Sequence, residues 1–512
     1  MATLLNALKN TPNSETENGA ITFSTTYNNN LDFFALASAK RNDLEGAISL
    51  FTRAFIEDRQ LALRNLFYLR DVRGGSGERN IFLQCLNYLF NAYSSDEDQD
   101  KFHSLLSFIP EYGRWKDLFD LMSLRSNNLN KDLGKYISII RKQLDEDILN
   151  HGKGKPVSLL AKWFPLYNCV KEAGRRKIAS LLCKELFNND YITCRKTITS
   201  LRKGIVEEKM SSKHFSEINY SHVPSYAMKK YRKAFLRNDE ERFTKFLEDV
   251  KQGKAKLNAS VLYPHDVVQS ILNASNFCLY FTCLNSVISD LSSDEIDALD
   301  AMWNSLPDYT DGENSLCVCD LSGSMFININ PSPSAVSIAL GIYFAEHNKG
   351  KFHNHFITFS DNPFLAEIKG SNIAEKIKSV VRDEYIGYST NFVGVFECLL
   401  KSAVKFKIPQ EEMPKRIYVI SDMEFNEAGN NENTNFEYVK RMYEEAGYEM
   451  PTMIFWNVAS RGYNVPVSKN EQEVVLVSGC SPSVLKLVFD GTTPEEFMLS
   501  VLNSERYSRI VW

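Results

Sequence analysis

The segment VCDLSGSMF, residues 318–326, places an aspartate, two serines and a glycine directly after a short apolar run. That run, SLCVC at 315–319, is typical of a strand buried on both faces. The glycine lets the backbone curve tightly after the strand. Asp320, Ser322 and Ser324 alternate along the turn, so their oxygen atoms can converge on one point. The segment therefore predicts a buried strand that ends at an oxygen-rich site.

The residues that follow alternate between short apolar runs and helical patterns. This alternation is typical of a mostly parallel sheet with helices on both faces. We therefore predict a doubly wound α/β domain over 311–490. Strands are expected at 315–322, 353–360, 415–422, 452–460 and 473–479, and helices at 332–348, 372–384, 391–406, 433–447 and 482–489.

Two further oxygen ligands occur later in this domain. Thr390 opens a predicted helix in GYSTNF, and Asp422 follows a predicted strand in VISDMEF. Ligands of such sheets bind beyond the carboxyl ends of the strands, so these groups should lie near Asp320. Oxygen ligands alone suit a hard cation such as Mg²⁺. The predicted metal ligands are Asp320, Ser322, Ser324, Thr390 and Asp422. The alternative is that Asp320 and Ser324 only cap the next helix.

Hydroxyl and water ligands would leave a divalent cation under-neutralised, so it could accept an anionic oxygen from a partner, either a carboxylate or a phosphate. Catalysis would need a general base, a nucleophile with a partner histidine, or carboxylates for a second metal, and none is evident beside this site. Glu424 and Glu427 are the nearest acids, and both are expected to be surface groups. We therefore expect no enzymatic activity.

Residues 31–305 have a different pattern, in which apolar residues recur at spacings of three and four. This pattern predicts antiparallel helix pairs of an irregular HEAT-like repeat, which could close into a ring. The stretch SLPDYTDGEN collects Pro, Asp, Gly and Asn and marks a domain boundary. The expected organisation is a tail at 1–30, an α-helical repeat domain at 31–305, the α/β domain at 311–490, and a C-terminal segment at 491–512 that docks on the body.

The stretch RNLFYLRDVRGGSGERNIF, residues 64–82, resembles a phosphate-binding loop at first sight. It is not a Walker motif, because no GK[ST] follows and no strand precedes it. We interpret it as a turn between helices, with glycines that permit positive φ and with Ser76 starting the next helix. Backbone contact with a nucleic-acid phosphate is the alternative.

Charge is distributed unevenly along the 512 residues, although the net charge is only −5. Residues 151–260 hold 24 Lys and Arg against 11 Asp and Glu, whereas residues 311–512 hold 18 against 26. A local excess of basic residues with interleaved aromatics such as Tyr226 favours a polyanion-binding surface. A solvated helix surface is the alternative. The candidate RNA-binding residues are Arg175, Arg176, Lys177, Arg195, Lys196, Arg202, Lys203, Lys229, Lys230, Arg232, Lys233 and Arg237.

Membrane and secretory classes are not favoured. No apolar run approaches the roughly 20 residues of a membrane helix, and the N-terminus lacks a basic start followed by an apolar segment. Ten cysteines without a CxxC pair are typical of reduced thiols rather than a disulfide or zinc framework. We expect a cytoplasmic protein.

Residues 315–490 resemble the von Willebrand factor A family. DLSGS, Thr390 and Asp422 match the three parts of its metal-ion-dependent adhesion site. The resemblance implies a Rossmann-like fold with a bound Mg²⁺, whose coordination is completed by an acidic group of a partner.

The helical half resembles the TROVE module of Ro autoantigen proteins. The similarity lies in LRNLFYLRDVRGGSGER, IPEYGRWKDL, LAKWFP, SHVPSYAMKKYRKAFLRND and YPHDVV. These phrases are more similar still to a related uncharacterised family found in viruses, bacteria and plants. The resemblance to Ro proteins implies binding of structured or misfolded RNA, with single-stranded ends in the hole of a helical ring and duplex on its basic outer surface.

Two functions remain open from the sequence. The first is an RNA-binding ribonucleoprotein scaffold that recognises RNA by shape and charge. The alternative is a protein-interaction module, including a viral structural or assembly role, in which the metal captures a carboxylate of a partner. The two differ in whether chelation abolishes binding.

Overall fold

The computed structural model consists of an arc of helices followed by a six-stranded sheet covered by helices on both faces. The predicted fold class, a helical repeat domain followed by a doubly wound α/β domain, is confirmed. The structure describes residues 11–512 except 94, 127–128, 130–131, 274–290, 311, 328, 383–384, 386–388, 428–432 and 488–490.

The helices of the N-terminal half pack mainly against their neighbours in the chain, as an irregular repeat does. Side-chain caps fix several starting points: Asp43 accepts the amide of Gly46, and Asp58 accepts that of Leu61. In order the helices are α2 (Asn29–Leu36), α3 (Leu44–Glu57), α4 (Arg59–Arg70), α5 (Asn80–Ala92), α6 (Asp96–Leu105), α7 (Ile109–Tyr112), α8 (Trp115–Leu124), α9 (Leu133–Gly152), α10 (Leu160–Trp163), α11 (Ala173–Phe187), α12 (Tyr191–Leu201), α13 (Val206–Ser211), α14 (Ser225–Asn238), α15 (Glu240–Lys251), α16 (Pro264–Asn273) and α18 (Ser293–Asn304).

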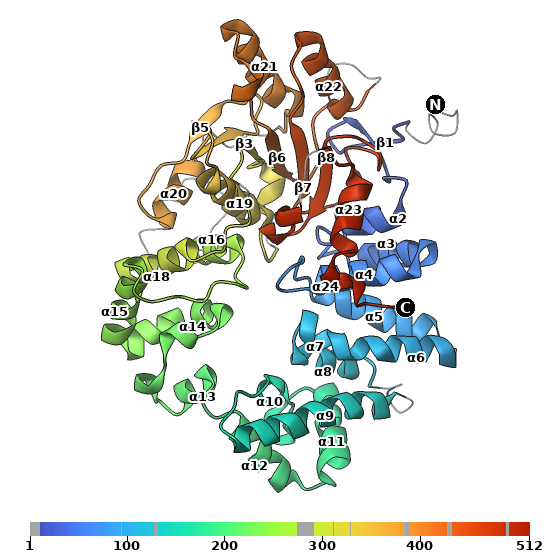
Figure 1. Ribbon diagram of the computed structural model, residues 1–512, viewed down its shortest axis with the longest axis vertical. Helices are drawn as coiled ribbons and strands as arrows, with labels where there is room; N and C mark the ends of the chain where they lie inside the picture. The colour runs from blue at the N-terminus through green and yellow to red at the C-terminus, as the bar shows by residue number, and fades with distance from the viewer. Residues whose placement is uncertain are drawn as a thin grey trace.

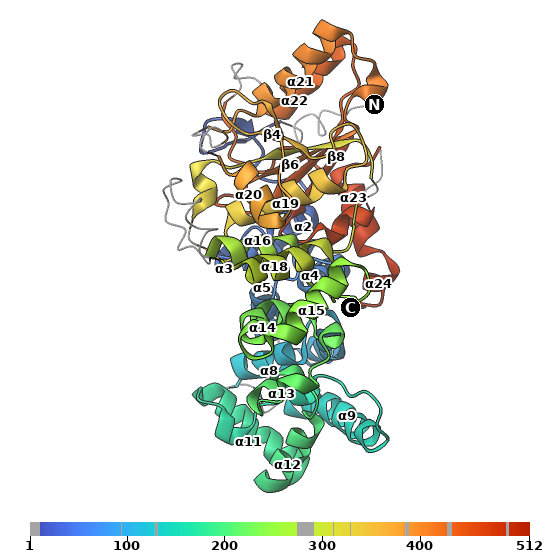
Figure 2. The same cartoon turned by 90° about the vertical axis from the view of Figure 1, so that its left-hand side faces the viewer.

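Both ends of this arc rest on the α/β domain (Figure 1). At one end α2 packs against the sheet, and at the other α16 packs against α19 (Pro333–His347). Figure 2 shows α16 and α18 next to α19 and α20 (Ile373–Val380) from the side. The arc and the α/β domain together therefore form a closed ring.

The sheet has the order β5-β4-β3-β6-β7-β8. All neighbouring strands are parallel except β5, which runs antiparallel to β4 at the edge and was not predicted. The strands are β3 (Ser315–Cys319), β4 (His355–Thr358), β5 (Leu365–Glu367), β6 (Arg416–Ser421), β7 (Thr452–Asn457) and β8 (Val474–Ser478), and the other helices of this domain are α21 (Phe392–Phe406) and α22 (Asn435–Ala446).

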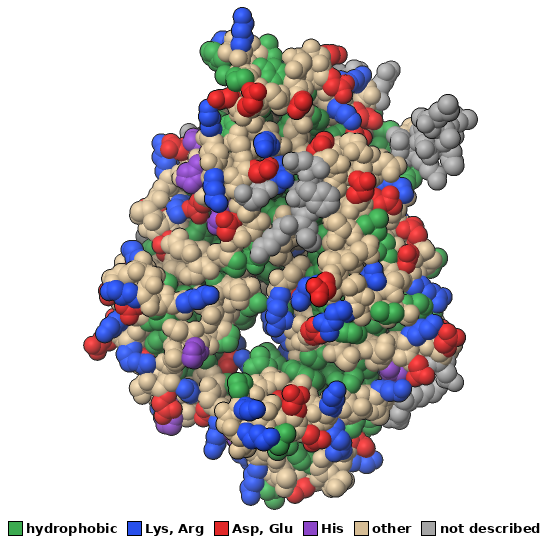
Figure 3. Space-filling view, in the orientation of Figure 1, with side chains coloured by type: hydrophobic (Ala, Val, Ile, Leu, Met, Phe, Trp, Pro, Cys, Tyr) green, Lys and Arg blue, Asp and Glu red, His purple; other side chains and the backbone are tan. Residues whose placement is uncertain are grey.

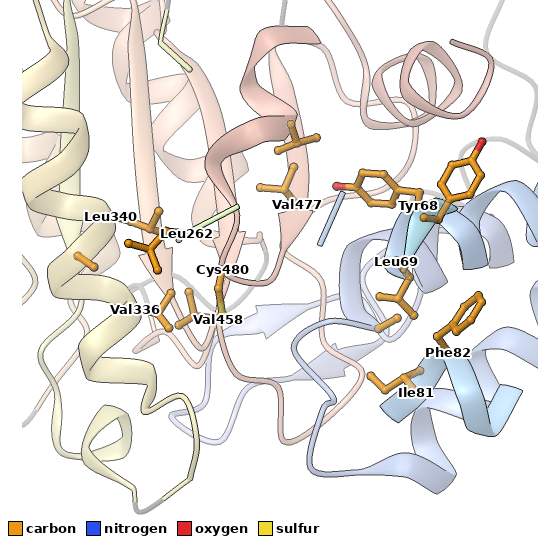
Figure 4. Packing of buried hydrophobic residues seen from close by; sticks show 14 of the residues in the cluster. Tyr68, Leu69, Ile81, Phe82, Leu262, Val336, Leu340, Val458, Val477 and Cys480 are labelled. Carbon is orange, nitrogen blue, oxygen red and sulfur yellow. The ribbon is translucent and has the colours of Figure 1, made fainter. Parts of the chain in front are cut away.

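Side chains of each strand alternate between two apolar cores, because successive residues point to opposite faces. Leu316 and Val318 of β3 pack with α21 and α22, whereas Cys317 and Cys319 pack on the face of α19. The core on the α19 face is continuous with that of the helices. Figure 4 shows part of it, where Leu262, just before α16, lies near Leu340 of α19.

The predicted boundaries differ from the structure at several points. Residues 482–487 form a 3-10 helix rather than an α-helix. Ser76 does not start α5, which begins at Asn80 with Arg79 as its N-cap. Of the three glycines in that turn, only Gly77 has a positive φ. The last residues expected for the helices at 372–384 and 482–489 lie outside the described residues.

Both ends of the described chain pack on its body. The N-terminal tail forms a short hairpin of β1 (Ser14–Glu15) and β2 (Ile21–Thr22), which lies on the α/β domain. The C-terminal segment forms α23 (Pro494–Leu502) and α24 (Glu505–Ser508) and packs against α4. Within the described ranges, no helix combines the length and the apolar character needed to cross a bilayer.

Candidate functional site: an oxygen-rich sheet edge and a cationic ring interior

The parallel pairing of β3 with β6 brings Asp320 and Asp422 to the same edge of the sheet, because each follows the carboxyl end of its strand. Asp320 is fully buried. Its Oδ1 accepts the backbone amide of Ser322 at 2.8 Å, and its Oδ2 accepts the hydroxyl of Ser421 at 2.6 Å. Ser322 Oγ and Ser324 Oγ lie 3.0 Å apart. The hydroxyls of Ser322 and Ser324 therefore lie together, and Asp320 is joined to the same turn through the amide of Ser322, while their role as metal ligands stays a prediction.

The electrostatics of this edge disfavour two free negative charges. Burial, and then repulsion from Asp422, raise the pKa of Asp320 to about 7. Asp422 accepts a hydrogen bond from Arg461, whose Nη2 lies 2.9 Å from Oδ2. The next residue, Met423, has φ 67°, a strained conformation for a residue with a side chain and one that clusters at functional sites.

Thr390 is held beside the loop that follows β6. Its hydroxyl donates to the carbonyl of Glu424 at 2.7 Å, and its amide donates to Oδ1 of Asn426 at 3.1 Å. The N-terminal hairpin also reaches this point, since Asn18 Nδ2 donates to the same carbonyl of Glu424 at 2.7 Å. Thr390 therefore contacts Glu424, which follows Asp422 by two residues in the chain. The N-terminal hairpin covers this contact.

The expectation that Glu424 is a surface group is wrong, whereas Glu427 is exposed. Glu424 is 4% exposed, and its Oε2 accepts the amide of Glu17 at 2.7 Å. Burial, followed by repulsion from Asp422, raises its pKa. Glu424 is turned inward because it anchors the N-terminal hairpin, which had been expected to be a tail.

The oxygen set fits a hard divalent cation in its chemistry. Each oxygen of Asp320 uses one of its lone pairs in the bonds above, and a carboxylate oxygen has a second. The hydroxyls of Ser322 and Ser324 add neutral oxygen donors. Within the described part of the chain, no three carboxylate, imidazole or thiol groups gather as a metal-binding set. An ion at this edge would thus depend on the two aspartates, hydroxyls and water.

A second polar site joins α8 and α14, which stand on opposite sides of the hollow of the ring (Figures 1 and 3). Buried Asp117 of α8 accepts Arg70 Nη2 at 2.6 Å and Arg79 Nε at 2.6 Å. A third arginine, Arg114, points its guanidinium at the ring of Tyr226 on α14, 5.9 Å from the centroid. Three arginines therefore surround one carboxylate beside an aromatic ring.

The charge at this point is not balanced. Burial, and then repulsion from Arg70, lower the pKa of Arg114. Tyr226 is 50% exposed, and Lys229 Nζ lies 5.6 Å from its ring centroid. The sequence had indicated Tyr226 and Lys229 but not the three arginines. The signal was available, because Arg70 and Arg79 lie in LRDVRGGSGER and Arg114 lies in IPEYGRWKDL.

The twelve predicted basic residues fall into two groups, four that are buried or half-buried and eight that are exposed. Arg202 and Arg175 line a pocket beside α10, and Lys229 pairs with Asp266 at 2.5 Å. Arg232 is 8% exposed and donates to the carbonyl of Lys229 at 2.7 Å, so it supports packing. The exposed members are Arg176, Lys177, Arg195, Lys196, Lys203, Lys230, Lys233 and Arg237, of which Lys233 pairs with Glu295 at 2.9 Å.

Comparison with known proteins connects this architecture with a family. The domain of unknown function DUF2828 matches residues 16–141 and 184–311, and the domain of unknown function DUF7788 matches 314–507. The chain is similar to the crystal structure of the Ro (RSR) protein of Deinococcus radiodurans, at 12% identity over 88% of this chain and 93% of that chain, with a TM-score of 0.41.

Among curated proteins, the chain is 30% identical over 525 residues to the uncharacterized protein L728 of Acanthamoeba polyphaga mimivirus, covering 96% of this chain and 87% of that protein. The predicted relationship to an uncharacterised family with viral members is confirmed. The chain, with its DUF2828 region followed by a DUF7788 region, therefore belongs to the same family as mimivirus protein L728.

Proposed function

We propose that this protein is an RNA-binding scaffold that recognises RNA by charge and shape through the helical ring. The observation that carries the proposal is the exposed ring of Tyr226 between Arg114 and Lys229, of which Lys229 also pairs with Asp266. An unpaired base can stack on the tyrosine while the cations contact the flanking phosphates. The sequence resemblance to Ro proteins supports the same class of ligand.

Exposed basic side chains on α11 and α12 add a second, electrostatic part to the proposed RNA-binding surface. Arg195 and Lys196 of α12 and Lys203 just after it are exposed, and α11 adds Arg176 and Lys177. Their positive charge would attract the backbone of folded RNA without reading its sequence. The proposal therefore combines one stacking position inside the ring with an electrostatic outer surface.

The test measures binding of fluorescein-labelled single-stranded RNA and of an RNA hairpin by anisotropy at increasing salt. Binding should weaken steeply with salt, because phosphate contacts release counterions. The double variant Tyr226→Ala/Arg114→Gln should bind single strands about tenfold less tightly, since stacking contributes about 1–3 kcal/mol per base. Affinity that is independent of salt, or unchanged in this variant, would contradict the proposal.

The matched control lies on α21, far from the ring interior in Figure 1. There Phe406 is 66% exposed, with Lys405 Nζ 5.2 Å from its ring centroid. The double variant Phe406→Ala/Lys405→Gln removes the same kinds of group from the α/β domain. RNA binding should be unaffected by it, which separates a local effect from a general loss of positive charge.

A second candidate function is metal-dependent capture of a protein partner at the sheet edge, favoured by the convergence of Asp320, Ser322 and Ser324 beside Asp422. These residues, with Thr390, would hold Mg²⁺, which would supply a positive centre for a partner carboxylate. Addition of Mg²⁺ should raise the melting temperature of the protein but not that of Asp320→Ala. An equal response of both proteins would count against this function.

The proposed functions are binding rather than catalysis. RNA incubated with the protein and Mg²⁺ should be recovered at full length, because neither site offers a nucleophile with a partner base. Specific cleavage that disappears in Asp422→Ala would overturn this part of the proposal.

A further inference from the structure

A pocket of about 190 Å³ lies between α8, α10 and α11, outside the sheet edge and separate from Tyr226. Buried Phe119 and Phe164 line it, with ring centroids 5.9 Å apart. Half-buried Trp163, the last residue of α10, forms part of its wall. The pocket is therefore an apolar recess with an aromatic side, formed by α8, α10, α11 and the segment that connects α10 to α11.

Cations dominate the charged groups around this recess. Lys116, Lys162, Arg175 and Arg202 line it, together with one carboxylate, Asp120. Lys116 Nζ lies 2.6 Å from Asp120 Oδ2, and Arg175 Nη2 lies 2.7 Å from Oδ1. Arg79, from outside the pocket, also pairs with Asp120, so three cations share this carboxylate, although Arg79 pairs in addition with Asp117 and Arg175 with Glu172.

The other two cations do not redress this imbalance. Lys162 pairs with Glu207 at 2.8 Å, which neutralises one charge. Arg202 donates to the carbonyls of Ala161 and Phe164, at 2.7 and 2.8 Å. Because carbonyl groups carry no full charge, the guanidinium of Arg202 keeps its positive charge while it fixes the chain beside Trp163.

Lys116 responds to this surplus of positive charge. Burial, followed by repulsion from Arg79 and Arg175, lowers its pKa to about 8. A pocket that disfavours one of its own cations would be stabilised by an anion next to Lys116 and Arg175. The aromatic wall of the same recess includes Trp163, whose ring centroid lies 5.5 Å from Lys162 Nζ.

Size limits what can enter. The pocket volume of about 190 Å³ lies below the roughly 300–1,000 Å³ of pockets that bind drug-sized ligands. A nucleic-acid duplex is therefore too large to enter. One phosphate with one flat base matches both the cations and the aromatic wall.

We propose that this pocket binds one phosphorylated nucleotide unit, with the phosphate at Lys116 and Arg175 and the base against Trp163. The nucleotide could be free or could be the phosphorylated end of an RNA, and in the second case the inference rests on the proposed function. The pocket lining includes neither Tyr226 nor Arg114, so variants of these two residues test the RNA surface without changing the pocket.

The first experiment is titration calorimetry of the full chain with adenosine 5′-monophosphate and, separately, with inorganic phosphate. Adenosine monophosphate should bind more tightly, because only it carries a base. Lys116→Gln should weaken it at least about tenfold through loss of a charge-assisted contact. Trp163→Ala should weaken the binding of the nucleotide but not the binding of inorganic phosphate. Absence of binding to the wild type, or equal affinity for the two ligands, would overturn the proposal.

Two further variants guard against unfolding as an explanation. Lys116→Arg keeps the positive charge and should restore most of the affinity. Lys135→Gln removes an exposed cation of α9, whose Nζ lies 3.2 Å from Asp100 outside the pocket, and should leave nucleotide binding unchanged. Loss of binding in Lys135→Gln equal to that in Lys116→Gln would contradict a local site.

The source of the nucleotide is decided by competition between RNAs. If the ligand is an RNA end, an oligonucleotide with a 5′- or 3′-phosphate should displace adenosine monophosphate, and the same oligonucleotide with hydroxyl ends should not. If the ligand is free, neither oligonucleotide should displace it. Tyr226→Ala/Arg114→Gln should leave adenosine monophosphate binding unchanged, which separates this site from the proposed RNA surface.

Discussion

Arg461 donates a hydrogen bond to Asp422, with Nη2 2.9 Å from Oδ2. Its other terminal nitrogen, Nη1, lies 2.6 Å from Oε2 of Glu17 in the N-terminal hairpin. One arginine therefore joins the hairpin to an aspartate predicted to hold a metal ion. Any cation that binds Asp422 must share this carboxylate with Arg461.

Arg461→Ala should therefore bind Mg²⁺ more tightly than the wild type. The partly exposed ion pair between Arg461 and Asp422 competes with the metal ion. Its removal should favour Mg²⁺ binding by about 1 kcal/mol, which corresponds to about a fivefold higher affinity. Calorimetric titration with Mg²⁺ measures the change. Arg441→Ala, at an exposed position of α22, is the control and should have no effect. Weaker Mg²⁺ binding in Arg461→Ala would show that the arginine supports the site instead.

The hairpin itself should contribute to stability through Thr16. Its hydroxyl donates to the carbonyl of Phe425 at 2.7 Å and accepts the amide of Ala20 at 2.9 Å, and the residue is 7% exposed. Thr16→Val keeps the shape but leaves both backbone groups unpaired, at a cost of about 1–3 kcal/mol. Urea denaturation should show a lower midpoint, whereas Ser24→Ala, at an exposed position, should not change it. Equal midpoints would mean that the hairpin is not part of the cooperative fold.

The α/β domain could be predicted well from sequence because its signals are local. The strands β3, β6 and β7 are nearly continuous apolar runs, with apolar side chains on both faces. Such runs indicate strands that are buried on both faces. The edge strand β5 was missed because its three residues, Leu-Ala-Glu, show too short an alternation.

The remaining features depend on contacts between segments that are distant in the sequence. Nothing near Glu424 indicates that Glu17 will cover it. In the same way, the segment IPEYGRWKDL indicates where a helix begins. It does not indicate that Arg114 will contact Tyr226 of α14. A surplus of basic residues identified the charged region, but only the fold shows which of them share a carboxylate.

The C-terminal segment should depend on one buried aspartate. Asp71 is fully buried and accepts Arg506 Nη2 at 2.7 Å and the hydroxyl of Tyr507 at 2.9 Å. Asp71→Asn breaks the ion pair and should cost about 3 kcal/mol, because a charge is left without its partner. Hydrogen exchange should accelerate in residues 494–512.

The matched control uses the exposed pair of the same segment. Arg509 Nη1 lies 2.6 Å from Glu111 Oε1, with both side chains open to solvent. Glu111→Gln should cost less than about 1 kcal/mol, as exposed pairs usually do. If both variants loosen the segment to the same extent, Asp71 is not what holds it.

Nucleotide binding to the pocket of Lys116 should decrease as the pH rises from 7 to 9. The lysine, with its pKa at about 8, loses its charge in this interval, whereas the phosphate, with a second pKa of about 6, keeps its own. Affinity for adenosine monophosphate should drop about three- to tenfold, and Lys116→Arg should give a flat profile. The groups that face or line this position are Arg79, Asp117, Asp120, Lys162, Cys169, Glu172, Arg175 and Arg202.

The exposed thiol of Cys169 lines the same pocket, so Cys169→Ser is the control and should keep the pH dependence of the wild type. Folding should respond with the opposite sign. Between pH 8 and the ordinary lysine pKa of 10.5 the unfolded chain binds more protons at Lys116, so this residue adds stability as the pH rises. A wild-type affinity that stays constant across this interval would contradict a phosphate contact at Lys116, because the charge that attracts the phosphate would have been lost without effect.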